Sequence, residues 1–199
     1  MPSFNDFVGY LTVGQEMTVQ FWFTVNEECP DDWCSVLHVA DADASYFPRL
    51  PGIYIDGTNK WFHVSMTDNF QNNNALDLED FEVTADGEEH LFYFQYTANE
   101  RVYAIDGTEL YRERCNATTD CSFNNSDYHG IHTVYLSDPW YTAMNISIRD
   151  LRIYPGMLEI RQNNSRSQPF AGTDTYFQHT LIYSQITNAH THHSEQWIG

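Results

Sequence analysis

Hydrophobic and polar residues alternate along several stretches of the chain, with the period of two that is typical of a half-buried β-strand. The clearest stretch runs from Glu16 to Val25. Its hydrophobic face carries Met17, Val19, Phe21 and Phe23, and its other face carries Thr18, Gln20, Trp22 and Thr24. The pattern predicts a strand that buries the first set in a core.

A second alternating stretch lies within residues 144–160. Its hydrophobic positions are Ile146, Ile148, Leu151 and Ile153. The alternation slips by one position at Arg149-Asp150, which predicts a β-bulge inside the strand. Pro155-Gly156 then ends the pattern, because proline cannot donate to a ladder hydrogen bond and glycine permits a turn.

The rest of the pattern predicts many short strands joined by turns, among them the hairpin signals Asp56-Gly57 and Asp106-Gly107. The expected strands are residues 35–40, 52–55, 61–66, 76–84, 90–96, 101–105, 108–112 and 131–136, after a lead-in strand within residues 1–16. We find no helical period longer than two turns and no internal repeat. Short strands at a spacing of roughly 8–12 residues favour an antiparallel β-sandwich.

Three segments resemble the laminin-G-like and concanavalin A-like jelly-roll domains. Ile-Arg-Asp-Leu-Arg-Ile-Tyr at residues 148–154 is similar to the closing strand of such domains. Residues 18–23 and 102–107 are similar to an early strand and to a Val-Tyr-x-x-Asp-Gly hairpin of the same fold. The resemblance covers about residues 10–160 and implies an all-β jelly-roll sandwich whose closing strand pairs beside the first. It concerns a fold and specifies no activity.

The end of the closing strand divides the chain into a jelly-roll domain at residues 1–162, a polar linker at 163–174 and a tail at 175–199. Residues 175–187 of the tail are uncharged, aromatic and β-branched, which predicts a strand. When this strand joins a sheet, the side chains expected to be buried are Tyr176, Phe177, Leu181, Ile182, Tyr183 and Ile186. Because a lone strand is unstable, it pairs either with its own sheet or with the sheet of a neighbouring subunit. Head-to-tail exchange with a neighbour does not close and gives a filament.

The charge balance excludes one class of partner. Lys and Arg total 9 against 28 Asp and Glu, so the chain of 199 residues has a formal net charge of −19. Such a surface repels the phosphate backbone, and we expect no nucleic-acid binding. No hydrophobic run approaches the roughly 20 residues of a membrane helix, so we expect no membrane insertion either.

Cysteines and glycosylation sequons indicate an extracellular, secreted protein. Two short-range pairs, Cys29 with Cys34 and Cys115 with Cys121, predict two local disulfides, although four cysteines allow three connectivities. Sequons for N-linked glycosylation begin at Asn116, Asn124, Asn145 and Asn163. The first residues have neither a basic nor a hydrophobic leader region, so secretion implies a leader that is absent from this chain.

Two groups of residues have the chemistry of a binding site. Asp41 and Asp43 offer carboxylate oxygens to calcium, and the alternative is a solvated acidic loop. The rings of Trp61, Trp140 and Tyr141 are candidates for stacking on sugars, and the alternative is core packing. No cofactor is required by any motif.

An enzymatic activity is not expected. Jelly-roll glucanases carry three acids on one strand face, but neither face of the nearest stretch, residues 77–82, supplies three. The leading hypothesis is therefore an extracellular glycosylated structural subunit that assembles with itself into a filament or matrix through its tail. The alternative is a carbohydrate-binding, lectin-like module, with or without calcium.

Overall fold

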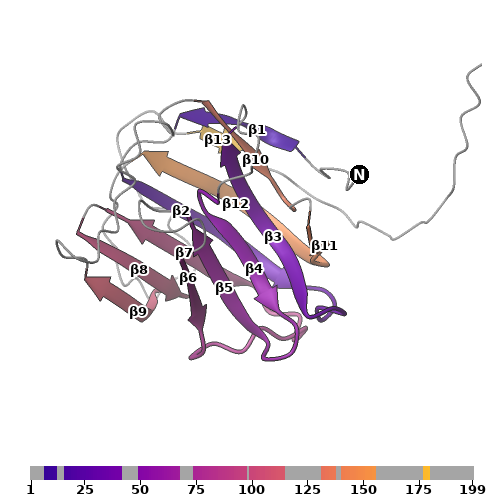
Figure 1. Ribbon diagram of the computed structural model, residues 1–199. Helices are drawn as coiled ribbons and strands as arrows, with labels where there is room; N and C mark the ends of the chain where they lie inside the picture. The colour runs from indigo at the N-terminus through magenta and orange to yellow at the C-terminus, as the bar shows by residue number, and fades with distance from the viewer. Residues whose placement is uncertain are drawn as a thin grey trace, which may run out of the picture.

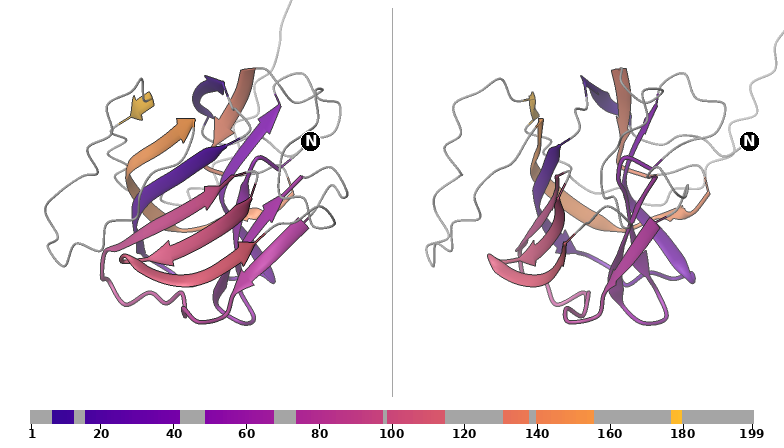
Figure 2. Two further views of the ribbon diagram at one scale, coloured as in Figure 1. Left: turned by 90° about the vertical axis from the view of Figure 1, so that its left-hand side faces the viewer. Right: turned by 60° about the vertical axis from the view of Figure 1, so that its left-hand side comes forward.

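The computed structural model describes residues 7–12, 16–41, 49–67, 74–97, 99–114, 131–137, 140–155 and 177–179. Every regular element in these ranges is a β-strand, and the strands form two sheets that pack face to face (Figures 1 and 2). The right-hand view of Figure 2 shows the two layers nearly edge-on. The prediction of an all-β sandwich is therefore confirmed. No helix that could span a membrane occurs among the described residues.

The first sheet, called sheet A, is antiparallel except for one short strand. Its main path runs in the order β1 (Phe7–Thr12), β10 (Ile131–Tyr135), β3 (Trp33–Asp41), β4 (Gly52–Asp56), β5 (Trp61–Met66) and β6 (Asn74–Leu78). β11 (Thr142–Ala143) pairs in parallel with Cys34 and Ser35 at the beginning of β3. β10 pairs with the later half of β3, so β10 and β11 follow one another along the same edge of β3.

The second sheet, called sheet B, is antiparallel throughout. Its order is β13 (Phe177–His179), β12 (Ile146–Pro155), β2 (Met17–Val25), β7 (His90–Tyr96), β8 (Glu100–Ile105) and β9 (Thr108–Arg114). The resemblance implied that the closing strand pairs beside the first strand of the chain. In the structure β12 pairs with β2, whereas the first strand, β1, lies in sheet A.

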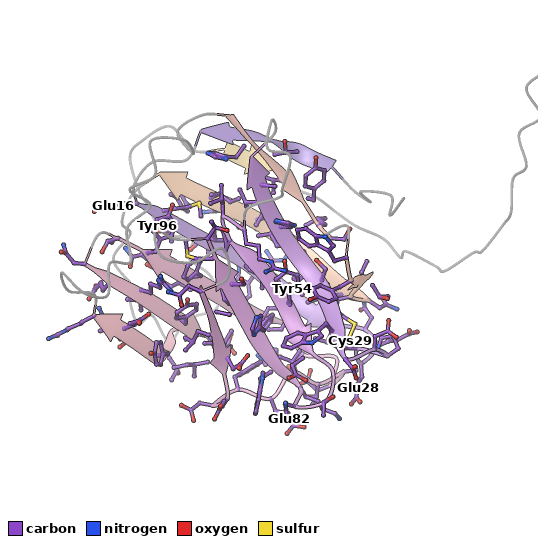
Figure 3. All side chains as sticks on the ribbon, in the orientation of Figure 1. Glu16, Glu28, Cys29, Tyr54, Glu82 and Tyr96 are labelled. Carbon is purple, nitrogen blue, oxygen red and sulfur yellow. A yellow bond between two sulfur atoms is a disulfide. The ribbon has the colours of Figure 1, made fainter. Side chains whose placement is uncertain are left out.

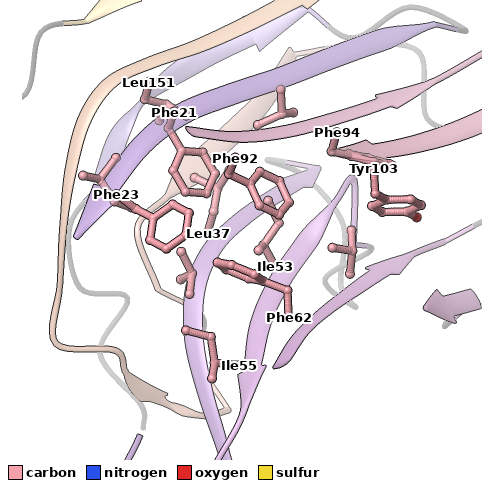
Figure 4. Close-up of a cluster of buried hydrophobic side chains, with 14 of the residues drawn as sticks. Phe21, Phe23, Leu37, Ile53, Ile55, Phe62, Phe92, Phe94, Tyr103 and Leu151 are labelled. Carbon is pink, nitrogen blue, oxygen red and sulfur yellow. The ribbon is translucent and has the colours of Figure 1, made fainter. Parts of the chain in front are cut away.

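The core lies between the sheets and is rich in phenylalanine. Phe21 of β2 stacks on Phe92 of β7 at 4.9 Å, and both belong to sheet B. Phe62 of sheet A contacts Phe92 at 5.0 Å and so joins the two layers (Figure 4). The four predicted core residues of β2, Met17, Val19, Phe21 and Phe23, are all buried. Each such side chain contributes about 1.5–3 kcal/mol when it is removed from water.

β12 contains the predicted bulge. Its pairing with β2 shifts register between Arg149 and Arg152, and Asp150 has a φ of 56°. Arg152 donates two hydrogen bonds to the Asp150 carboxylate, at 2.9 and 2.7 Å. The bulge lets both Ile148 and Leu151 face the core, although three positions separate them.

One predicted strand was too long. The sequence predicted a strand over residues 76–84, but β6 ends at Leu78. The chain turns there, since the backbone N–H of Phe81 donates to the carbonyl oxygen of Leu78 at 3.3 Å. The Phe81 ring then packs against Phe23 and Phe62 of the core. Phe81 thus reaches the core from a turn. Its position in the sequence gives the same alternation of hydrophobic and polar residues as a strand would.

Candidate functional site

The outward face of sheet A carries a row of polar and aromatic side chains. Ile53 and Ile55 of β4 point into the core, so Tyr54 between them points to the other face. The register pairs Ser35 with Tyr54, Tyr54 with His63, and His63 with Asp77. Four neighbouring strands thus place one side chain each in a single row. Figure 3 shows Tyr54 in this position on β4.

The His63 end of the row is polar. Nδ1 of His63 lies 2.7 Å from Oδ1 of Asp77, which fixes the orientation of the imidazole. The ring of Trp33, at the beginning of β3, approaches the His63 ring edge-on at 4.6 Å. A half-exposed indole and an oriented hydrogen-bonding pair therefore lie side by side.

Two exposed rings come from the segment just before β11. Tyr141 lies 5.4 Å from Tyr54 at an interplanar angle of 80°, and 6.4 Å from Trp33. Tyr141 is 37% exposed and Trp140 is 48% exposed, whereas Tyr54 is only 1% exposed. Because β11 follows the edge of β3, this segment reaches over β3 to the Tyr54 ring of β4.

Arg49 holds the other end of the cluster. Its Nε donates a hydrogen bond to the Tyr54 hydroxyl at 3.0 Å. Its guanidinium carbon lies 5.5 Å from the centre of the Tyr54 ring and 5.1 Å from that of Trp140. The ring of His38 lies 5.4 Å from that of Trp140. We call the set of Trp33, His38, Arg49, Tyr54, His63, Trp140 and Tyr141 the aromatic face.

The loop between β2 and β3 positions Trp33. A disulfide joins Cys29 to Cys34, as predicted from their spacing, and the Cα atoms are 5.8 Å apart. The N–H of Gly57 donates to the carbonyl oxygen of Asp32 at 2.9 Å, and the Thr142 hydroxyl donates to the Asp31 carboxylate. The loop is thereby tied to both the β4–β5 turn and β11.

The β4–β5 turn that receives this loop is itself rigid. Oδ1 of Asp56 accepts hydrogen bonds from the N–H groups of Thr58 and Asn59, at 2.8 and 2.9 Å. Burial acts to raise the pKa of Asp56, but these bonds and the charge of His63 outweigh burial and lower the pKa below its ordinary value. The carboxylate therefore stays ionised at neutral pH.

Oγ of Ser35, in the row described above, is buried and has no hydrogen-bond partner within the described residues. The same holds for Nε1 of Trp61, in the neighbouring row beside Asp56. Leaving such buried groups unpaired costs free energy, which an ordered internal water would recover.

The structure brings together two of the three rings proposed for sugar stacking. Trp140 and Tyr141 both belong to the aromatic face, and Trp61 lies on the same side of sheet A, one row away. Sequence reasoning missed Trp33, Tyr54 and Arg49. The place of Tyr54 between the core residues Ile53 and Ile55 is a signal that could have indicated its outward face, but the strand register that assembles the site cannot be read from a single sequence.

Several other predicted sites fall partly or wholly outside the described residues. Asn145 immediately precedes β12, and its side-chain oxygen accepts a hydrogen bond from Asn26 at 3.3 Å. Asp41 ends β3, opposite His132 of β10. The remaining predicted residues, Asn116, Asn124, Asn163, Cys115, Cys121 and Asp43, lie outside the described residues. In the described ranges no group of three or more His, Cys, Asp or Glu residues could hold a metal ion.

The tail strand is described only at its beginning. Phe177–His179 pairs with Leu151–Ile153 of β12, and thus with the sheet of its own chain. This is the first of the two arrangements that the sequence allowed. The other predicted members of the strand, Tyr176, Leu181, Ile182, Tyr183 and Ile186, lie outside the described residues.

The acidic stretch compared with glucanases does not form a catalytic strand. Asp77 and Leu78 are the last residues of β6, and residues 79–82 follow in a turn. Its carboxylates therefore do not share one strand face.

The sequence matches no protein-family model and no curated protein. The fold, in contrast, is similar to solved structures. A heptameric SAP-like pentraxin from Limulus polyphemus matches with a TM-score of 0.54 at 10% identity, over 90% of this chain and 85% of the pentraxin chain. Trypanosoma rangeli sialidase in complex with sialic acid matches with a TM-score of 0.52 at 13% identity, over 73% of this chain and 21% of the sialidase.

Botulinum neurotoxin type C matches with a TM-score of 0.50 at 11% identity, over 75% of this chain. This chain spans about a third, 34%, of the toxin chain. The fold is a concanavalin A-like jelly-roll sandwich. At these identities the similarity establishes the concanavalin A-like fold and no function.

Proposed function

We propose that this protein is an extracellular carbohydrate-binding, lectin-like module, and that glycans bind to the aromatic face. The observation that carries the proposal is the exposure of Trp140 and of Tyr141, the second of which packs against the buried, hydrogen-bonded ring of Tyr54. Large rings normally bury their apolar faces, so two neighbouring exposed rings beside polar groups mark a binding surface.

The chemistry of the aromatic face suits a sugar. A pyranose ring presents an apolar C–H face and a rim of hydroxyl groups. The apolar C–H face can stack on the rings of Trp33, Trp140 and Tyr141. The His63–Asp77 pair can form hydrogen bonds with the hydroxyl groups of the sugar. In ligand sites generally, a small number of polar groups fixes the orientation of the ligand.

Proteins of similar fold support a glycan ligand. The entry of botulinum neurotoxin type C into cells depends on its interaction with two ganglioside molecules. The structure of Trypanosoma rangeli sialidase has been solved in complex with sialic acid. We propose a binding role for this chain and not catalysis, because the acids of residues 77–82 share no strand face. The Cys29–Cys34 disulfide and the four sequons support an extracellular location.

A glycan array tests the proposal. The wild-type protein should bind at least one class of glycan, and Trp140→Ala and Tyr141→Ala should each reduce the signal at least about tenfold. Tyr111→Ala is a matched control, because Tyr111 is also 37% exposed but lies on β9 of sheet B. Equal loss in all three variants, or no bound glycan at all, would contradict the proposal.

Assembly through the tail is a second proposal. β13 pairs with β12 at the edge of sheet B, and an identical strand from a neighbouring copy would find the same register there. Exchange of identical elements between protomers requires no new contacts. Sedimentation velocity across a range of concentrations tests it: growing polymers support exchange, and a monomer at every concentration contradicts it.

A further inference from the structure

The rings of the aromatic face follow one another in a strip. The ring of Tyr141 lies near both Trp33 and Tyr54, with centroid distances of 6.4 and 5.4 Å. Arg49 then bridges Tyr54 to Trp140, which contacts His38. Exposed rings therefore stand at two separate places, one beside Trp33 and one beside His38.

The strip follows the whole length of β4. Trp33 pairs with Asp56 at one end of β4, and His38 pairs with Gly52 at the other end. At the rise of an extended strand, these two positions of β3 are roughly 15 Å apart. A single sugar ring cannot contact both ends of such a strip.

The rings do not form one flat surface. The planes of Tyr141 and Trp33, the two rings of the Trp33 end that solvent reaches, differ by 44°. A flat, ordered array of polymer chains can stack only on coplanar rings. Rings that turn along a strip suit one flexible chain, whose successive sugars can each rotate to meet a ring.

Charge favours a neutral ligand. The Trp33 end carries the carboxylates of Asp31, Asp56 and Asp77, whereas the guanidinium of Arg49 lies at the other end. The chain as a whole has a formal charge of −19. An anionic glycan would approach against this field, whereas neutral hydroxyl groups can donate to the carboxylates.

We propose that the aromatic face binds a single, extended, neutral oligosaccharide at two or more subsites. One subsite is formed by Trp33 and Tyr141, and another by Trp140. This inference rests on the proposed glycan-binding function and specifies the ligand as a chain of uncharged sugars.

Titration calorimetry with defined oligosaccharides tests this inference. The probes are β-linked glucose, N-acetylglucosamine and mannose series from the monosaccharide to the hexasaccharide, with sialyllactose as the anionic probe. For at least one neutral series the affinity should rise about tenfold or more from the monosaccharide to the longer members, and sialyllactose should bind more weakly than they do.

Single-ring variants should separate the subsites. Trp140→Ala removes one subsite, so the hexasaccharide should bind to this variant about as weakly as a shorter member of its series binds to the wild type. Tyr141→Ala removes the subsite at the Trp33 end and should weaken the hexasaccharide to a similar extent. Trp33→Ala is a second variant for that end. Tyr111→Ala should retain the length dependence, and thermal unfolding of each variant should show that it is folded.

The outcomes separate this inference from the proposed function. Affinity that is independent of chain length, or tightest binding to sialyllactose, overturns the inference and leaves glycan binding intact. Binding to an insoluble polysaccharide without binding to its soluble oligomers overturns the single-chain arrangement. No binding to any probe, together with a silent glycan array, overturns both.

Discussion

The ring of Tyr141 stands nearly perpendicular on the ring of Tyr54, at 80° and a centroid distance of 5.4 Å. One ring is 37% exposed and the other 1% exposed. Tyr54 is held by its strand and by the hydrogen bond from Arg49, so it gives the exposed loop residue a fixed base. A preorganised aromatic surface binds a ligand with less loss of side-chain entropy than a mobile one.

Removing the hydroxyl group of Tyr54 should weaken this base. In Tyr54→Phe the Nε–H of Arg49 loses its acceptor, while the ring remains in place. We expect a loss of about 0.5–1.5 kcal/mol in the free energy of unfolding, together with weaker glycan binding. Urea denaturation and calorimetry measure the two effects. Unchanged glycan affinity would show that Arg49 does not order the aromatic face.

Gly57 should resist any side chain. A Cβ atom at this position would lie 2.0 Å from the carbonyl oxygen of Asp31 and 3.0 Å from Sγ of Cys29. Gly57→Ala should therefore displace the disulfide loop, at a cost of about 1–3 kcal/mol, and weaken binding at the Trp33 end. Thr58→Ala, at an exposed neighbouring position, is the control and should change neither the free energy of unfolding nor the glycan affinity. Equal stability of the two variants would refute the expected clash.

The local disulfide should add modest stability. Closing the short loop between Cys29 and Cys34 removes unfolded-state entropy worth about 2 kcal/mol in the chain-entropy model. The double variant Cys29→Ser, Cys34→Ser should lose about this amount of unfolding free energy and remain folded.

Non-reducing peptide mapping should find Cys29 joined to Cys34 and Cys115 joined to Cys121. A peptide that links Cys34 to Cys115 would contradict both assignments.

His90 should make stability depend on pH. Its Nδ1 lies 2.8 Å from Asp106 and its Nε2 lies 3.5 Å from Asp86. Burial acts to lower the pKa of His90, but the hydrogen bonds and charges of these carboxylates outweigh burial and raise the pKa. A raised folded pKa means that the stabilisation is complete below the unfolded pKa of about 6.5 and is lost as the pH rises through the folded pKa.

The variant His90→Gln tests this linkage. The wild type should exceed the variant in unfolding free energy by more at about pH 5.5 than at about pH 9, because only the protonated imidazole pairs with both carboxylates. Urea denaturation at the two pH values gives the difference. A difference that does not vary with pH would assign His90 a packing role alone, through its contacts with Phe23 and Phe81.

The sequence predicted the fold wherever burial is one-sided. Alternation identified the buried face of β2, and a slip in alternation located the bulge at Asp150, because both follow from the two-residue period of a strand. It failed over residues 79–84, where Phe81 reaches the core from a turn. The pairing of the closing strand beside the first was implied by the resemblance and was wrong for β1, which pairs with β10 in sheet A.

The aromatic face was predictable only in part. Trp140 and Tyr141 were proposed because they are aromatic residues in a polar segment. Tyr54 and Trp33 belong to the same site through the pairing of β3 with β4 and through the path of the segment before β11. Such relationships depend on register between distant segments, and a single sequence does not specify register.

The most direct test of glycan binding on the aromatic face is an NMR titration that follows the indole N–H signals of the five tryptophans. The titrant is the neutral oligosaccharide that binds best in calorimetry. If glycans bind to the aromatic face, the signals of Trp33 and Trp140 shift in proportion to bound ligand, while the signal of Trp22, which lies under Arg149 on sheet B, stays in place. A shift of Trp22 without shifts of Trp33 and Trp140 would place the glycan on the opposite sheet and contradict the account.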